Sequence, residues 1–304
     1  MAKIKFRDVR LSKSNKERLD AINGIIIEYQ KEGYKLTLRQ LYYQLVSRDV
    51  IPNKQSEYSK LSNLLKEGRM GGIVDWDAIE DRLRQPSKPS SWDTPQDAME
   101  SLIAQYKLPR MEGQHNYIEV WVEKDALSGV LKRVTQKYHI PILVNRGYSS
   151  ASAMFDAYNR FRNGIEEIIA NEESDGANVI IFYLGDFDPS GMDMIRDIED
   201  RIREFATKHF EYFPLSVIPI ALTKEQIRKY NPPPNPAKRT DPRANKFIEE
   251  HGATSWEVDA LPPNVLNKLL EDAIKENINI DRYEEIVNRE SADKEKLQAL
   301  IEQL

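Results

Sequence analysis

Apolar residues in the first 70 positions recur every three or four residues, a spacing that predicts three short amphipathic helices. We expect the first helix to begin at a capping box at Ser14 and the second at a capping box at Thr37. A third helix is expected from about Ser56. The second helix would bury one stripe of side chains, formed by Leu38, Leu41, Tyr42, Leu45 and Val46.

The segment after the third predicted helix, Gly71-Gly72-Ile73-Val74, has the pattern of a short hairpin. Three helices followed by a hairpin are typical of a winged-helix unit, in which the third helix usually contacts the DNA groove. The sequence therefore predicts a winged-helix DNA-binding domain over residues 1–84. Residues 85–116 are rich in proline and serine, and we expect a linker around one helix that begins at Thr94.

Beyond this linker the pattern changes to apolar runs that alternate with helical stretches. Such runs are typical of parallel strands covered on both faces, and they lie at residues 117–122, 140–144, 179–184 and 215–221. The alternation predicts an α/β domain over residues 117–304, with a Toprim-like, mostly parallel sheet flanked by helices and a charged helical extension at its end. Residues 256–261 are expected to return to the sheet.

Composition narrows the chemistry that this chain of 304 residues can perform. It contains no cysteine, which excludes a disulfide framework, a thiolate zinc site and a cysteine nucleophile. The four histidines are scattered without the spacing of metal ligands. We find neither a signal peptide nor a long apolar stretch, so we expect a cytoplasmic protein with no membrane partner. It would be associated with the nucleoid if its source is a prokaryote or a phage.

The charge is unevenly distributed although the net charge is only −5. Residues 1–90 carry 18 Lys and Arg against 12 Asp and Glu, whereas the rest carries 26 against 37. A basic front end can supply contacts to phosphate, although ordinary scatter of surface charge would give a similar count. The candidate contacts to double-stranded DNA are Lys54, Lys60, Lys66, Arg69, Lys238 and Arg239.

Carboxylates follow two of the predicted strands. Asp186, Asp188 and Asp193 come after the run at 179–184, and Glu123 ends the run at 117–122. The carboxyl ends of parallel strands meet at one edge of a sheet, so these acids are expected to lie together. Hard oxygen ligands of this kind suit Mg²⁺. An isolated Asp-x-Asp is also typical of a solvated turn, and the strand before it and the third aspartate favour the metal site.

Three motifs resemble the Toprim domain of topoisomerases, primases and related nucleases. They are Glu123-Lys-Asp-Ala, Asn145-Arg-Gly-Tyr-Ser and Gly185-Asp-Phe-Asp-Pro-Ser-Gly-Met-Asp. The last is most similar to the A subunit of topoisomerase VI and its meiotic double-strand-break relatives. The resemblance covers about residues 117 to 220. It implies that Glu123, Asp186 and Asp188 hold Mg²⁺, with Asp193 assisting, and that the metal organises a scissile phosphodiester.

Tyr43 lies off the buried stripe of the second predicted helix and shares a face with Arg39, so we expect it to be exposed. From the residues alone, an exposed tyrosine beside an arginine more often packs or contacts phosphate than attacks a substrate. The segment Arg39-Gln-Leu-Tyr-Tyr also resembles the Arg-x-x-Tyr-Tyr signature of topoisomerase VI A subunits. That resemblance implies that Tyr43 attacks DNA and that Arg39 activates it or clamps the phosphate.

The sequence as a whole predicts Mg²⁺-dependent DNA cleavage by tyrosine transesterification. The resemblance implies a homodimer in which the tyrosine of one protomer meets the metal of the other. It also implies a separate ATPase subunit where strands are passed, because no ATPase module is fused here and the chain is short for a complete A subunit. Two alternatives stay open. One is a Toprim nuclease that uses metal-activated water, and the other is a non-catalytic DNA-binding or assembly protein with the same fold.

Overall fold

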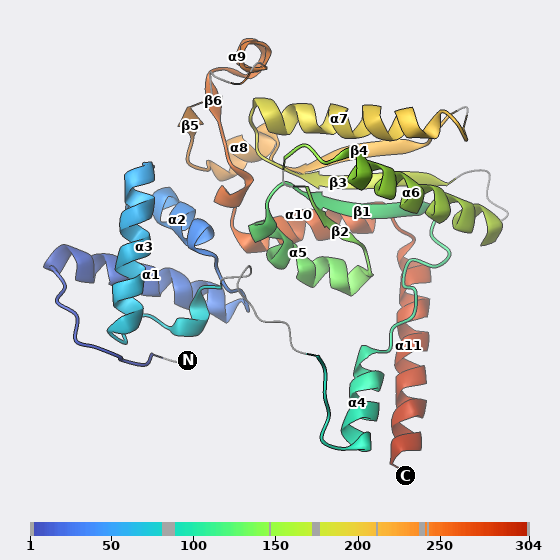
Figure 1. Ribbon diagram of the computed structural model, residues 1–304, viewed down its shortest axis with the longest axis horizontal. Helices are drawn as coiled ribbons and strands as arrows, with labels where there is room; N and C mark the ends of the chain where they lie inside the picture. Colours follow the sequence, from blue (N-terminus) through green and yellow to red (C-terminus); the bar gives the residue numbers. More distant parts are fainter. Residues whose placement is uncertain are drawn as a thin grey trace.

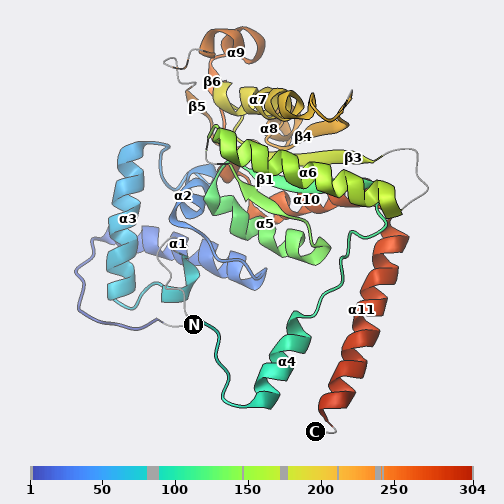
Figure 2. The same ribbon diagram turned by 45° about the vertical axis from the view of Figure 1, so that its right-hand side comes forward.

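The computed structural model describes residues 3–80, 89–145, 147–171, 177–210, 212–236, 241 and 243–302. Figure 1 shows three N-terminal helices at one side of an α/β body, and an arm of two helices that extends from that body. Figure 2 shows the same three parts after rotation. None of the helices in the described ranges is both long and apolar enough to cross a membrane.

A four-stranded parallel sheet forms the centre of the α/β body. Its strands are β1 (Asn116–Val122), β2 (Ile142–Val144), β3 (Asn178–Leu184) and β4 (Leu215–Ala221), in the order β2-β1-β3-β4. The apolar runs form buried strands because helices cover both faces of the sheet. The α/β class and the parallel sheet flanked by helices are therefore confirmed.

Alternate residues of each strand enter two separate cores. In β1, Val120 and Val122 face a core shared with α5 (Asp125–Tyr138) and α10 (Pro263–Glu276). Trp121 faces the opposite core, which is shared with α6 (Ala151–Asn171) and α7 (Pro189–Ala206). Two shorter helices, α8 (Lys224–Tyr230) and α9 (Ala244–His251), follow β4.

The N-terminal unit consists of α1 (Lys13–Lys31), α2 (Leu38–Ser47) and α3 (Gln55–Met70), packed around one apolar core. The capping box at Thr37 is confirmed, because the Thr37 side chain accepts from the Gln40 backbone and the Gln40 side chain accepts from Thr37. The expected start of the first helix was wrong. Ser12, and not Ser14, is the N-cap, and its hydroxyl accepts a hydrogen bond from the Asn15 backbone.

The expected hairpin after α3 is not formed. Gly71 makes an isolated bridge to Lys5, and the chain then enters a 3-10 turn, η1 (Trp76–Ala78). Residues 81–88 lie outside the described residues. The structure therefore shows a three-helix unit at the N-terminus but does not show a winged helix.

The expected linker helix, α4 (Pro95–Gln105), is confirmed with Thr94 as its N-cap. It packs beside the last helix, α11 (Ile280–Ile301), and the two form the arm in Figures 1 and 2. Glu290 on α11 anchors the chain that follows α4, since its carboxylate receives hydrogen bonds from Lys107 and Arg110. The linker is thus attached to the C-terminal helix over part of its length.

Residues 256–261 do not add a strand to the sheet, so that expectation was wrong. Two short strands, β5 (Asn235–Pro236) and β6 (Thr254–Ser255), pair with each other, and Trp256 bridges Phe187 just beyond β3. A second 3-10 turn, η2 (Val258–Ala260), then packs against α2. This segment joins the carboxyl edge of the sheet to the N-terminal helices.

Candidate active site

The fold places the strand-end acids Glu123 and Asp186 in contact. β1 and β3 are neighbours whose last residues, Val122 and Leu184, are paired in register. The Glu123 backbone donates to the Leu184 carbonyl at 3.0 Å, and the Asp186 backbone donates to Glu123 Oε2 at 2.9 Å. The sequence prediction that both acids lie at the same edge agrees with this geometry.

Burial disfavours the charged forms of both acids. Burial, with a smaller contribution from the Asp186 carboxylate, raises the pKa of Glu123 to about 7. Burial also raises the pKa of Asp186, while the Lys124 ammonium group opposes that rise. A cation that binds between the oxygens of two such carboxyl groups would stabilise their charged forms.

Asp188 and Asp193 have other bonding partners. Asp188 is the N-cap of α7, and its Oδ1 accepts from the Gly191 backbone at 2.7 Å. The turn requires glycine there, because a Cβ on Gly191 would lie 2.2 Å from the Asp186 carbonyl oxygen. Asp193 belongs to a separate cluster, in which it accepts from Tyr148 Oη at 2.6 Å and from Arg243 Nη1 at 3.2 Å.

Within the described residues, no group of three or more Asp, Glu and His side chains is arranged to hold a metal ion. The predicted four-acid set is therefore not assembled as such. Two carboxylates still fit Mg²⁺, which commonly takes one or two from the protein and the rest of its ligands from phosphate and water. Tyr183 supports this fit, because its buried Oη has no hydrogen-bond partner in the described part of the chain and lies near Glu123 and Asp186.

Lys124 occupies a central position that sequence reasoning did not assign. Its Nζ lies 2.7 Å from the Asp186 carboxylate and 2.8 Å from Glu257 Oε2. Asp259 Oδ2 lies 3.7 Å from the same ammonium group. Glu257 and Asp259 were also missed, because the sequence predicted a strand over residues 256–261 where the structure has the 3-10 turn η2.

Tyr43 is buried, contrary to the expectation that it lies on an exposed face. Both Tyr42 and Tyr43 are 5% exposed. Both tyrosines belong to the apolar core of the helical unit and both line the cavity beside Asn235, and η2 packs against the helix that carries them. Burial raises the pKa of Tyr43, and the Arg39 cation and the Asn235 side chain act in the opposite direction.

Arg39 links the tyrosine to the acids. Its guanidinium carbon lies 5.7 Å from the centre of the Tyr43 ring. The same group forms an ion pair with Glu257 and lies 2.7 Å from Asp259 Oδ2 through its Nε. Arg39 therefore lies beside Tyr43, as the sequence predicted, but its Nε and Nη2 atoms are already paired with acids.

One cavity of about 370 Å³ contains most of the predicted catalytic residues. It lies between α2, the start of α3 and the carboxyl edge of the sheet. Its lining includes Arg39, Tyr43, Lys54, Asp186, Asp188, Asn235 and Glu257. The structure thus brings the tyrosine, the arginine and two of the predicted metal ligands to one place within a single chain.

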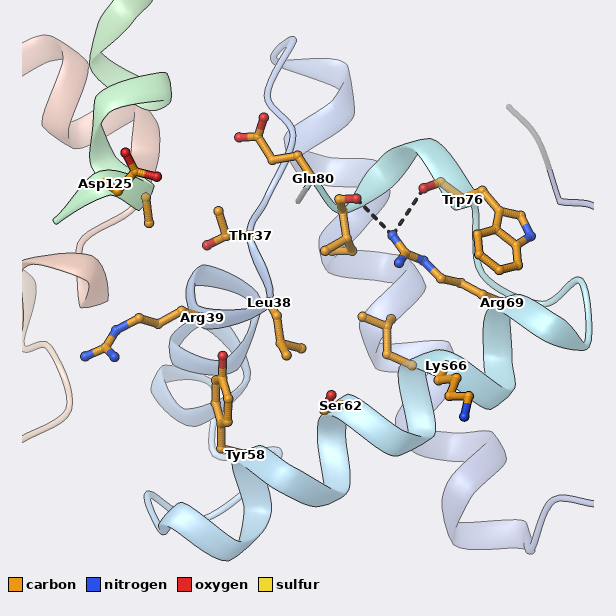
Figure 3. A pocket seen from close by; sticks show the side chains of 13 residues that line it. Thr37, Leu38, Arg39, Tyr58, Ser62, Lys66, Arg69, Trp76, Glu80 and Asp125 are labelled. Carbon is orange, nitrogen blue, oxygen red and sulfur yellow. Dashed lines mark hydrogen bonds between the residues drawn. The ribbon is translucent and has the colours of Figure 1, made fainter. Parts of the chain in front are cut away.

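A second groove of about 580 Å³ adjoins α3 and includes Lys66 and Arg69 in its lining. Figure 3 shows Arg39 and Arg69 on opposite sides of it. Arg69 donates to the carbonyl oxygens of Trp76 at 3.1 Å and Ile79 at 2.9 Å, so it holds η1 in place rather than being free for DNA. Lys66 also lines the groove, and its ammonium group makes no hydrogen bond or ion pair within the described residues.

The other predicted DNA contacts differ in their positions. Lys54 lines the cavity beside Tyr43. Lys60 is exposed and pairs with Glu57 one turn earlier at 2.6 Å. Lys238 and Arg239 lie outside the described residues. The structure therefore leaves Lys54 and Lys66 as the best placed of the predicted lysines.

Comparison with known proteins gives no family for this chain. No protein-family model matches it, and no curated protein matches its sequence. The resemblance to Toprim enzymes therefore rests on the three sequence motifs alone.

Proposed function

We propose that this protein cleaves double-stranded DNA in a Mg²⁺-dependent reaction with Tyr43 as the nucleophile, in the manner of a topoisomerase VI A subunit. One observation carries the proposal: Tyr43, Arg39, Asp186 and Asp188 line the same cavity. Transesterification of a phosphodiester needs a hydroxyl nucleophile, a cation that binds phosphate and acids that hold a metal. These groups come from two modules that are far apart in the sequence.

In the proposed step, a bond forms between Tyr43 Oη and phosphorus while the bond from phosphorus to a deoxyribose oxygen breaks. The phenolic proton leaves to solvent, and the departing sugar oxygen takes up a proton. Arg39 binds the phosphate and brings positive charge to the phenol, which favours its ionised form. Bound Mg²⁺, held by Glu123 and Asp186, would neutralise charge on the phosphate.

The arrangement supports a site that is complete within one chain. The resemblance implies that the tyrosine of one protomer meets the metal of its partner, but here Tyr43 and Asp186 line one cavity of the same chain. We propose that each chain cuts one strand by itself and that a homodimer would set two such sites on the duplex. A separate ATPase subunit would serve strand passage.

A nuclease that uses water is the second candidate, and one observation favours it. Tyr43 is buried and its pKa is raised, so little of it is ionised at neutral pH. In this alternative the acids and Arg39 keep their roles, and water takes the place of the phenol.

Supercoiled plasmid incubated with the protein and Mg²⁺, then denatured with and without protease, tests the proposal. We expect nicked or linear DNA that carries covalently attached protein, and no adduct with Tyr43→Phe. Cleavage by Tyr43→Phe at the rate of the parent would establish the water nuclease. No cleavage under any metal-replete condition, with an ATPase partner also supplied, would favour the non-catalytic alternative.

A further inference from the structure

The turn that contains Glu257 and Asp259 carries two carboxylates into the space between α2 and the sheet. Both meet Arg39: Glu257 by an ion pair to Nη2, and Asp259 Oδ2 at 2.7 Å from Nε. Glu257 also accepts from Lys124 Nζ at 2.8 Å. The two acids therefore engage both cations that lie between Tyr43 and Asp186.

The backbone of this acidic turn is anchored to the catalytic edge. The Val258 backbone donates to Asp186 Oδ1 at 2.9 Å, and the Trp256 backbone exchanges hydrogen bonds with Phe187. Val258 and Ala260 are buried on either side of Asp259. The position of the two carboxylates is thus set by the fold and is not a chance surface contact.

The two carboxylates differ in their freedom to move. The Asp259 side chain is completely buried, whereas 23% of the Glu257 side chain is exposed. Asp259 forms an ion pair with Arg39 Nε, and Glu257 accepts a hydrogen bond from the outer nitrogen, Nη2. Displacement of Glu257 alone would leave Arg39 oriented by Asp259 with its outer nitrogens free.

Carboxylate and phosphate bind a guanidinium group through the same charged, fork-shaped contacts. A carboxylate on Arg39 and Lys124 therefore competes with a phosphate for the same donors. We propose that Glu257 is an internal substitute for a DNA phosphate, which keeps the site closed until a duplex displaces it. The inference rests on the proposed function, because it takes DNA as the ligand of Arg39 and Lys124.

The test measures binding of a short fluorescent duplex by anisotropy, with chelator present so that neither metal nor cleavage contributes. Glu257→Gln should bind about tenfold more tightly than the parent, since a competing charge-assisted hydrogen bond is worth roughly one such step. Glu225→Gln is the matched control, because it removes the same charge from an exposed position on α8. The control corrects for the general effect of net charge.

A double-mutant comparison tests whether the gain in DNA affinity comes from the loss of the Arg39–Glu257 ion pair. If Glu257 acts by holding Arg39, most of the gain should disappear when Glu257→Gln is combined with Arg39→Gln. Should Glu257→Gln fail to fold, Glu257→Asp keeps the charge but shortens its reach, and it should bind more tightly than the parent by a smaller factor.

The possible outcomes distinguish the role of Glu257 from the proposed DNA-cleaving function. A gain in Glu257→Gln that exceeds the control and depends on Arg39 supports the closed-site inference. Binding by Glu257→Gln equal to that of the control, or a gain that persists fully in the Arg39→Gln background, overturns the inference and leaves the proposed function standing. If the parent and all variants bind no duplex, the proposed function fails and the inference fails with it.

Discussion

Replacement of Glu123 by glutamine should stabilise the metal-free protein at alkaline pH. The environment raises the pKa of this carboxyl from its ordinary value of 4.5 to about 7. The folded state therefore holds the proton more tightly than the unfolded state. The protonated Glu123 side chain therefore contributes fully to the stability of the fold below about pH 4.5, and this contribution is lost as the pH rises through about 7. At about 1.4 kcal/mol for each pKa unit, the ionised side chain destabilises the fold by about 3 kcal/mol at alkaline pH.

Urea unfolding with chelator present, at about pH 5 and about pH 8, measures this effect. Between the two conditions, the free energy of unfolding of the parent should fall by about 2.5 kcal/mol more than that of Glu123→Gln. This figure is smaller than the full value of about 3 kcal/mol because Glu123 in the unfolded chain is already partly ionised at about pH 5. The substitution keeps a side-chain oxygen that can accept the 2.9 Å hydrogen bond from the Asp186 backbone. The comparison therefore removes the charge while retaining an acceptor.

Glu225→Gln is again the control, because it removes a charge that is exposed to solvent on α8. Its pH dependence should match that of the parent. Equal losses in the parent and in Glu123→Gln would refute the reasoning, since they would show that Glu123 ionises without cost in the fold. Added Mg²⁺ should stabilise the parent more than Glu123→Gln. A parent that Mg²⁺ does not stabilise would contradict the metal assignment and leave the pH argument intact.

Three further predictions follow from the cavity and the groove. A mixture of Tyr43→Phe and Asp186→Ala should nick plasmid no faster than either variant alone, and restored cleavage would show that the site is shared between chains. Tyr42→Phe should lower the free energy of unfolding by about 1 kcal/mol, because it removes a buried hydroxyl that donates to Asn53. Tyr43→Phe should lower it by a similar amount, because its hydroxyl belongs to an equally buried side chain near Asn235; no loss in Tyr43→Phe would indicate a solvated phenol. Lys66→Ala should weaken duplex binding on all sequences and reduce the salt slope by ~0.9, whereas an unchanged slope would show that the groove beside α3 does not face DNA.

The local pattern of the sequence determined the parallel strands and the acids that end them. An uninterrupted apolar run can be buried on both faces only between two layers of helices, and parallel strands bring their carboxyl ends to one edge. That is why Glu123 and Asp186 could be placed together before the fold was known. The capping box at Thr37 was equally predictable, because its bonds join residues only three positions apart.

Only the tertiary structure decided which surfaces and charges remain free. The periodicity of α2 identified Tyr42 as a core residue, but it could not reveal that Tyr43 is equally buried in a fold where η2 packs against the same helix. In the same way, the sequence could not show that Arg69 donates hydrogen bonds to the backbone around η1. The ion pair of Arg39 with Glu257 joins positions 218 residues apart, a distance over which no sequence period extends. Spacing along the chain specifies which face of an element is apolar, whereas contacts between distant elements determine which polar groups on its other faces are already bound.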